Sequence, residues 1–75
     1  MSTPDPLDPR SLLGANLRSA RERAGLTQEA LGHRAGYHPT EVNRIENGRR
    51  NPGLITIVKL ARALEIPASD LVAGL

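Results

Sequence analysis

A strip of polar side chains with helical spacing carries the hydrogen-bonding chemistry of this sequence. Its members are Thr40, Asn43, Arg44 and Asn47. Residues three or four apart share one face of a helix, while Val42 and Ile45 would point to the opposite face. Hydroxyl, carboxamide and guanidinium groups supply the donors and acceptors that base edges and phosphates require. The pattern predicts a helix that buries one face and presents the other to a partner.

Catalytic and metal chemistry have little support in the sequence. The chain has no cysteine, which excludes a disulfide scaffold and thiolate-bound zinc. His33 and His38 are five residues apart with no third ligand nearby, so we interpret them as a surface residue and a cap residue. The chain has no nucleophile with a paired base and no phosphate loop. We therefore expect a protein that binds, is not an enzyme, and needs no cofactor and no metal.

Two short helices joined by a tight turn would position the polar strip. Thr27 is a good N-cap residue, and it predicts a helix over residues 28–35 that ends at Gly36. Gly32 in the middle of that helix costs up to about 1 kcal/mol relative to alanine, which indicates that another backbone passes close by. Four inward-facing residues would brace the pair of helices: Leu31, Ala35, Val42 and Ile45.

The second helix of the pair is predicted over residues 39–47. Pro39 favours the first helical position and pushes His38 into the extended conformation of an N-cap. Tyr37 would act as a hydrophobic staple in front of the cap, and Glu41 stands three residues after it. A carboxylate close to phosphates is unfavourable unless it accepts from cytosine N4 or folds back onto the cap. We favour the cap for Glu41.

The N-terminal part is predicted to form a tail followed by a helix. The first nine residues hold three prolines and two aspartates and are predicted to form a flexible tail, which leaves residues 10–75 as the domain. Asp8 and Pro9 would open a helix that runs to about residue 24 and ends at a left-handed Gly25. Its buried stripe would be Leu13, Leu17, Ala20 and Ala24.

The C-terminal part is predicted to supply the back wall of the core. The most apolar segment forms a helix over residues 54–64, and Pro67 starts a last short turn or helix through residue 72. The residues expected to be buried in the longer helix are Leu54, Ile57, Leu60, Ala61 and Leu64.

Length and composition limit the architecture to one small all-α domain. The chain has 75 residues, and Tyr37 is its only aromatic residue, so aliphatic side chains must form the core of closely packed short helices. The net charge of +2 permits nucleic-acid binding without requiring it. Apolar runs are too short to cross a bilayer, and we expect a cytoplasmic protein with no membrane contact.

A set of motifs from Leu13 to about Val72 makes the pattern specific. They are Arg21, Gly25-Leu26-Thr27-Gln28-Glu29, Gly36, Val42, Ile45-Glu46-Asn47-Gly48, Arg49-Arg50-Asn51-Pro52 and Leu60-Ala61-Arg62-Ala63-Leu64. This segment resembles the lambda-repressor-like helix-turn-helix family of the Cro or XRE type. The resemblance implies a compact five-helix DNA-binding domain, with the helix-turn-helix in the second and third helices.

The resemblance also implies roles for individual residues. The helix over residues 39–47 would lie in the major groove, and Arg44 is the main candidate for pairing with guanine. The base-reading set would be Thr40, Arg44, Asn43, Pro39 and Glu41. The phosphate-binding set would be Thr27, Gln28, Asn47, Arg49, Arg50 and Asn51. The family pairs an arginine with a glutamate, here Arg21 with Glu46.

The function that follows is sequence-specific DNA binding by a small transcriptional regulator of the repressor or controller type. Its partners would be double-stranded DNA and a second copy of the chain, as a homodimer on an inverted repeat. The last short helix and the exposed part of the preceding one are the candidate contact surfaces. No small-molecule effector site is evident. The alternative is an antitoxin-like module that binds a protein and contacts DNA secondarily.

Overall fold

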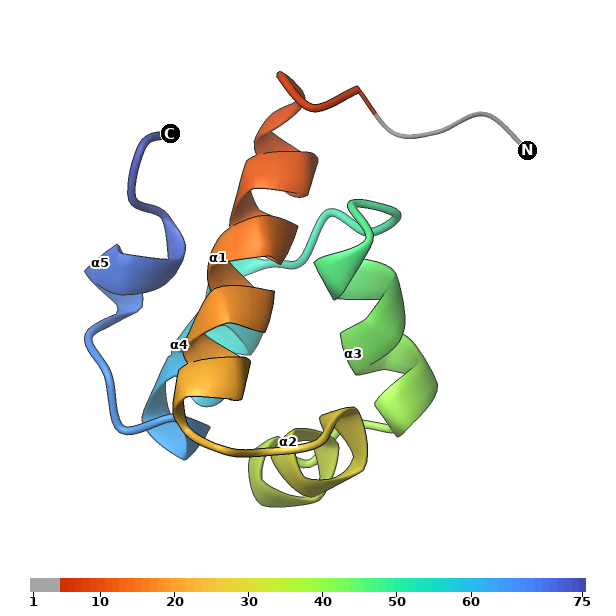
Figure 1. Cartoon of the computed structure of the whole chain (residues 1–75), viewed down its shortest axis with the longest axis vertical. Coiled ribbons are helices and arrows are strands. Elements are labelled where there is room, and N and C mark those ends of the chain that lie inside the picture. Colours follow the sequence, from red (N-terminus) through yellow and green to blue (C-terminus); the bar gives the residue numbers. More distant parts are fainter. Residues whose placement is uncertain (1–4) are drawn as a thin grey trace.

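The computed structural model describes residues 5–75, and these residues form five helices and no strand. The helices are α1 (Pro9–Arg23), α2 (Gln28–Ala35), α3 (Pro39–Glu46), α4 (Leu54–Ala63) and α5 (Ala68–Leu71). In Figure 1, α1 stands at the centre with α3 on one side and α5 on the other, while α2 crosses below and α4 lies behind. The predicted all-α fold is confirmed.

Capping interactions set where the helices begin, as the sequence predicted. The Asp8 carboxylate accepts from the amide of Arg10 at 2.8 Å, and the Thr27 hydroxyl accepts from the amide of Ala30 at 3.0 Å. His38 is extended, and its Nδ1 accepts from the amide of Thr40 at 3.1 Å. The guanidinium of Arg10 also donates to Asp8 and lowers the pKa of that carboxyl to about 2. Local chemistry thus fixes three helix starts.

The predicted tail is only partly within the described residues. Residues 1–4 lie outside them, and residues 5–8 form a turn in which the amide of Asp8 donates to the carbonyl of Asp5 at 2.9 Å. Pro9 is already the first residue of α1. The helix therefore begins one residue before the expected start of the domain.

One hydrophobic core joins all five helices. Its buried aliphatic residues are Leu13, Leu17, Ala20, Leu31, Val42, Ile45, Leu60, Ala61, Leu64 and Leu71. Ala35 and Tyr37 pack against this core while remaining partly exposed. The inward-facing residues of α2 and α3 are therefore those that the spacing predicted, and they hold the two helices against α1 and α4.

Two residues expected in the core are exposed instead. Ala24 follows the end of α1 and is exposed, because the chain turns away at Gly25, which has a φ of +72°. Leu54 is 72% exposed because it is the first residue of α4, and the buried stripe of that helix is confined to its second half. Ile57 is only partly buried. Helical spacing identified the buried faces of α1 and α4 correctly, but it predicted that they extend too far toward the helix ends.

Glycine permits two close backbone approaches in this small core. A Cβ at Gly32 would clash with the carbonyl oxygen of Tyr37, so the predicted passage of another backbone beside Gly32 is confirmed. A Cβ at Gly14 would lie 2.5 Å from the carbonyl oxygens of Ile45 and Glu46. Gly14 therefore lets α1 touch the last turn of α3 directly.

Replacing Gly14 with alanine should move α3 away from α1. Because the new methyl group meets two backbone carbonyls, which cannot rotate aside, we expect a loss of about 1–3 kcal/mol in the free energy of unfolding. Urea unfolding followed by circular dichroism measures this loss. Gly53→Ala is the matched control, since a Cβ there meets nothing within 4 Å. Equal stability of the two variants would contradict the close contact.

Candidate nucleic-acid interface

A buried ion pair anchors the end of α3 to α1. Nε of Arg21 donates to Oε2 of Glu46 at 2.6 Å, and Nη2 donates to Oε1 at 3.1 Å. The Glu46 side chain is 2% exposed and that of Arg21 is 12% exposed. The hydrogen bonds to Glu46 raise the pKa of Arg21. Nη1 of Arg21 also donates to the carbonyl of Leu26 at 2.8 Å, so one side chain joins three segments.

Gln28 extends this anchor to the exposed surface. Its Nε2 donates to Oε1 of Glu46 at 3.0 Å, and its Oε1 accepts from Nδ2 of Asn43 at 3.4 Å. The carboxamide of Gln28 is therefore held in one orientation by the carboxylate of Glu46. The chain of contacts runs from α1 through α3 and α2 to an exposed residue of α3, which restricts how Asn43 presents its own amide.

The exposed face of α3 contains the polar strip that the sequence predicted. Thr40, Asn43, Arg44 and Asn47 are all exposed. Val42, Ile45 and Glu46 are buried on the opposite face. Nδ2 of Asn47 donates to the carbonyl of Asn43 at 2.9 Å, which satisfies a carbonyl in the last turn. Pro39 is partly buried at the first position of the helix, so it borders the strip.

The loop after α3 places polar and cationic side chains beside this face. Arg49, Arg50 and Asn51 are exposed, and they follow Gly48, which has a φ of +71°. The expected cap by Glu41 is wrong: its carboxylate oxygens accept from Nε of Arg50, both at 3.2 Å. An arginine distant in sequence by nine residues thus replaces the local amide as the partner of Glu41.

The start of α2 lies on the other flank of the strip. Thr27 is exposed and uses its hydroxyl to cap the helix, while the side chain of Gln28 bonds to Glu46 and Asn43. The first backbone amides of α2 have no carbonyl one turn earlier within the helix, and such amides are suited to binding an anion. Sequence reasoning assigned Gln28 to phosphate and did not find its contact with Glu46.

The histidines and the tyrosine have structural surroundings. His38 caps α3, and His33 is exposed. The Tyr37 hydroxyl donates to the Thr56 hydroxyl at 3.0 Å, and Nζ of Lys59 lies 5.9 Å from the ring centre. Tyr37 therefore joins the turn between α2 and α3 to α4. Residues 5–75 contain no group of three metal-ligating side chains and no helix long and apolar enough to span a membrane.

Comparison with known proteins identifies the family of this arrangement. The family model described as "Helix-turn-helix" matches residues 17–71. The HTH-type transcriptional regulator y4dJ of Sinorhizobium fredii is 41% identical over 66 residues, which cover 88% of this chain and 86% of that protein. The chain belongs to this helix-turn-helix family. The helix-turn-helix motif of this family corresponds to α2 and α3.

Solved structures agree with this assignment. The restriction-modification controller protein C.AhdI from Aeromonas hydrophila superposes with a TM-score of 0.81 at 39% identity, over 83% of this chain and 94% of that one. The P22 c2 repressor, solved with a synthetic operator, superposes with a TM-score of 0.77 at 25% identity, over 85% and 97% of the two chains. The fold of this helix-turn-helix domain is therefore that of the controller and repressor proteins.

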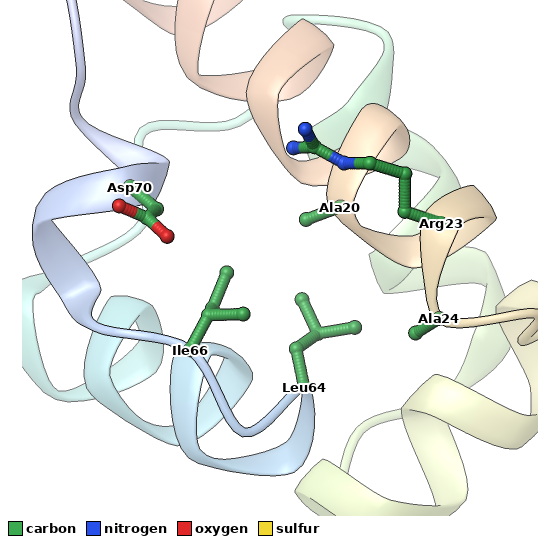
Figure 2. Close-up of a pocket in the computed structure, with 6 residues that line it drawn as sticks. All are labelled: Ala20, Arg23, Ala24, Leu64, Ile66 and Asp70. Atoms are coloured by element: carbon green, nitrogen blue, oxygen red, sulfur yellow. The ribbon is translucent and has the colours of Figure 1, made fainter.

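A shallow hollow of about 270 Å³ lies away from α3, between α1 and the C-terminal segments. Figure 2 shows Arg23 and Asp70 facing each other across it, with Leu64 and Ile66 below. Its remaining lining is Ala20 and Ala24. The hollow is open, its lining is both polar and aliphatic, and none of its residues belongs to α2 or α3.

Removing the guanidinium of Arg21 should destabilise the domain strongly. Arg21→Met leaves the 2%-exposed carboxylate of Glu46 without its cation, and breaking a buried pair in this way costs about 3–5 kcal/mol. The melting temperature, followed by circular dichroism, should fall far more than for Arg18→Met, since Arg18 and Glu22 form an exposed pair at 3.9 Å. Similar melting temperatures for both variants would show that the buried pair does not anchor α3.

Proposed function

We propose that this protein is a sequence-specific transcriptional regulator that inserts α3 into the major groove of an operator. One observation carries the proposal: the exposed polar face of α3 is flanked on one side by the Arg49–Arg50 loop and on the other by the start of α2. A groove that receives the helix would bring its two phosphate backbones to these flanks. Relatives named as transcriptional regulators and controller proteins support this function.

Base reading is assigned to side chains of α3, the recognition helix of this proposal. Arg44 is exposed, and we assign it to guanine, whose O6 and N7 accept from a guanidinium in a bidentate manner. Asn43 keeps a carboxamide oxygen for an adenine amino group while its Nδ2 is held by Gln28. The base-reading set is completed by the residues of the first turn: Pro39, Thr40 and Glu41.

Phosphate binding is assigned to the two flanks. Thr27 and Gln28 belong to the flank at the start of α2, whose first amides favour an anion. The other flank consists of Asn47, Arg49, Arg50 and Asn51. These contacts would supply affinity and salt dependence but no sequence preference.

A homodimer would place two recognition helices in successive major grooves. Half-sites on one side of the duplex lie about 34–36 Å apart, which exceeds the reach of one domain whose largest extents are 30 × 24 × 22 Å. Leu54 and Ile55 on α4 and Val72 after α5 are exposed apolar residues. Because α4 and α5 pack together, we assign the dimer contact to their exposed sides.

The remaining features of the proposal follow from DNA binding. The protein acts without catalysis and without a bound effector, and its occupancy of DNA is set by its concentration and by dimerisation. It works in the compartment that holds bacterial or phage DNA, the cytoplasm.

Selection from random duplexes tests the proposed function. The wild-type protein should enrich an inverted repeat, because two identical subunits read two identical half-sites. Repeating the binding at several salt concentrations separates sequence preference from phosphate attraction. Weak binding that is equal for all sequences and fades with salt would contradict the proposal and favour a protein partner instead.

Arg44→Ala should weaken binding to the selected operator by about 1–3 kcal/mol and relax the preference at one base pair of each half-site. Fluorescence anisotropy with operators altered at single positions measures both effects. Arg49→Ala is the comparison, because loss of a phosphate contact should weaken binding to all sequences equally and make the salt dependence shallower by about one. Unchanged base preference in the Arg44 variant would refute its assignment to guanine.

Substitution of Ile55 and Val72 by aspartate should convert the dimer to a monomer. Charges introduced into an apolar contact remain unpaired when the subunits meet, so association should weaken by at least tenfold. Sedimentation equilibrium measures the dissociation constant. Leu7→Asp introduces an aspartate at an exposed apolar residue outside this contact (89% exposed) and should leave association unchanged. Dimers that persist in the double variant would place the interface elsewhere.

A further inference from the structure

The ion pair between Glu41 and Arg50 stands beside the proposed guanine-reading residue. Both carboxylate oxygens of Glu41 lie 3.2 Å from Nε of Arg50, and the two side chains are 33% and 42% exposed. Glu41 and Arg44 are three residues apart on α3, so their side chains are neighbours one turn apart on the helix surface. The pair is therefore part of the surface that would meet the groove.

An ionised carboxylate in a major groove discriminates strongly among bases. It only accepts hydrogen bonds, whereas guanine presents two acceptors and thymine an acceptor and a methyl group. Adenine places an acceptor next to its amino group, and cytosine presents its N4 amino donor alone. A carboxylate at the edge of α3 thus disfavours most sequences and is compensated best by cytosine.

Arg50 gives Glu41 a fixed position without using all of its own donors. Only Nε of Arg50 bonds to the carboxylate, and a guanidinium has four further N–H groups on its terminal nitrogens. Each carboxylate oxygen has a second lone pair for another donor. The pair can therefore accept from a base through Glu41 and donate to a phosphate through Arg50 at once, while the two charges cancel.

We infer that Glu41, positioned by Arg50, is a specificity-determining residue that selects a cytosine beside the base read by Arg44 and reduces binding to all other DNA. This inference rests on the proposed function, because it assumes that α3 enters the major groove. The carboxylate repels phosphates and base acceptors on non-specific duplex. On the operator the cytosine amino group offsets that repulsion, so the ratio of specific to non-specific affinity rises.

Glu41→Gln and Arg50→Met test the inference against a matched control. Glu22→Gln removes one carboxylate from another exposed ion pair, the one with Arg18 on α1, which lies outside the helix-turn-helix. All proteins are first compared by thermal unfolding to establish that they are folded. Dissociation constants are then measured for the operator selected by the wild type, for operators with each single base pair exchanged, and for a random duplex, at several salt concentrations.

The wild type should discriminate cytosine from the other bases at one position of the half-site by about tenfold. Glu41→Gln should reduce this preference to below about threefold and bind the random duplex more tightly. Its salt dependence should steepen by about one, because the charge of Arg50 is no longer cancelled. Arg50→Met should lose the same preference, since the carboxylate is no longer held, and Glu22→Gln should match the wild type.

Three results would contradict the inference, and they are distinguishable. If the wild type selects an operator and Glu41→Gln retains every base preference, Glu41 does not determine specificity although the proposed function stands. If the wild type enriches no sequence, the proposed function fails and the inference fails with it. Loss of the preference in Glu41→Gln but not in Arg50→Met would refute the positioning role of Arg50.

Discussion

The buried carboxylate of Glu46 is the constraint on which the position of α3 and of its exposed polar face depends. It lies at the last position of α3 with 2% of its side chain exposed. A negative charge there is opposed both by desolvation and by the negative end of the helix dipole. Arg21 and Gln28 compensate with three hydrogen bonds of 2.6 to 3.1 Å. Glu46 is therefore stable only where α1 and α2 meet it, which fixes α3 relative to both.

Short helices need such external fixation. An isolated helix of eight residues is unstable in water because nucleation costs more than so few hydrogen bonds return. The C-terminal end of α3 is held by Arg21 and by the backbone contact at Gly14, while its start follows the close approach of Tyr37 to Gly32. With both ends fixed, the orientation of the exposed strip is determined by the core and not by the strip itself.

Local cues in the sequence predicted the elements well because their causes are local. The caps at Asp8, Thr27 and His38 involve residues two or three positions away, so the sequence alone contains both partners. Helical spacing likewise identified the buried face of α3. The same spacing wrongly predicted burial of Ala24 at the end of α1 and of Leu54 at the start of α4. Both residues lie past the edge of the core and are exposed. Where a core ends depends on neighbouring segments, which spacing does not describe.

Partner choice by side chains was harder to predict because it depends on tertiary distance. Glu41 stands at the position of a capping box, yet it pairs with Arg50, which the loop after α3 brings back beside the first turn. A guanidinium within reach competes well with a backbone amide, because it adds the attraction of a positive charge to the hydrogen bond with the carboxylate. The resemblance to a family paired Arg21 with Glu46, but it gave no partner for Glu41.

Some polar residues of α3 hold the helix in place, and others are exposed on its surface. Two residues from outside α3, Gln28 and Arg50, contact its polar side chains at opposite edges of the exposed face. Gln28 bonds inward to Glu46 and outward to Asn43, while Arg50 bonds to Glu41 at the other edge. A displayed side chain held by such a neighbour loses less rotamer freedom on binding than a free one. Within residues 5–75 no such neighbour holds Arg44, which is exposed, so ordering its longer side chain in a complex would cost more rotamer freedom.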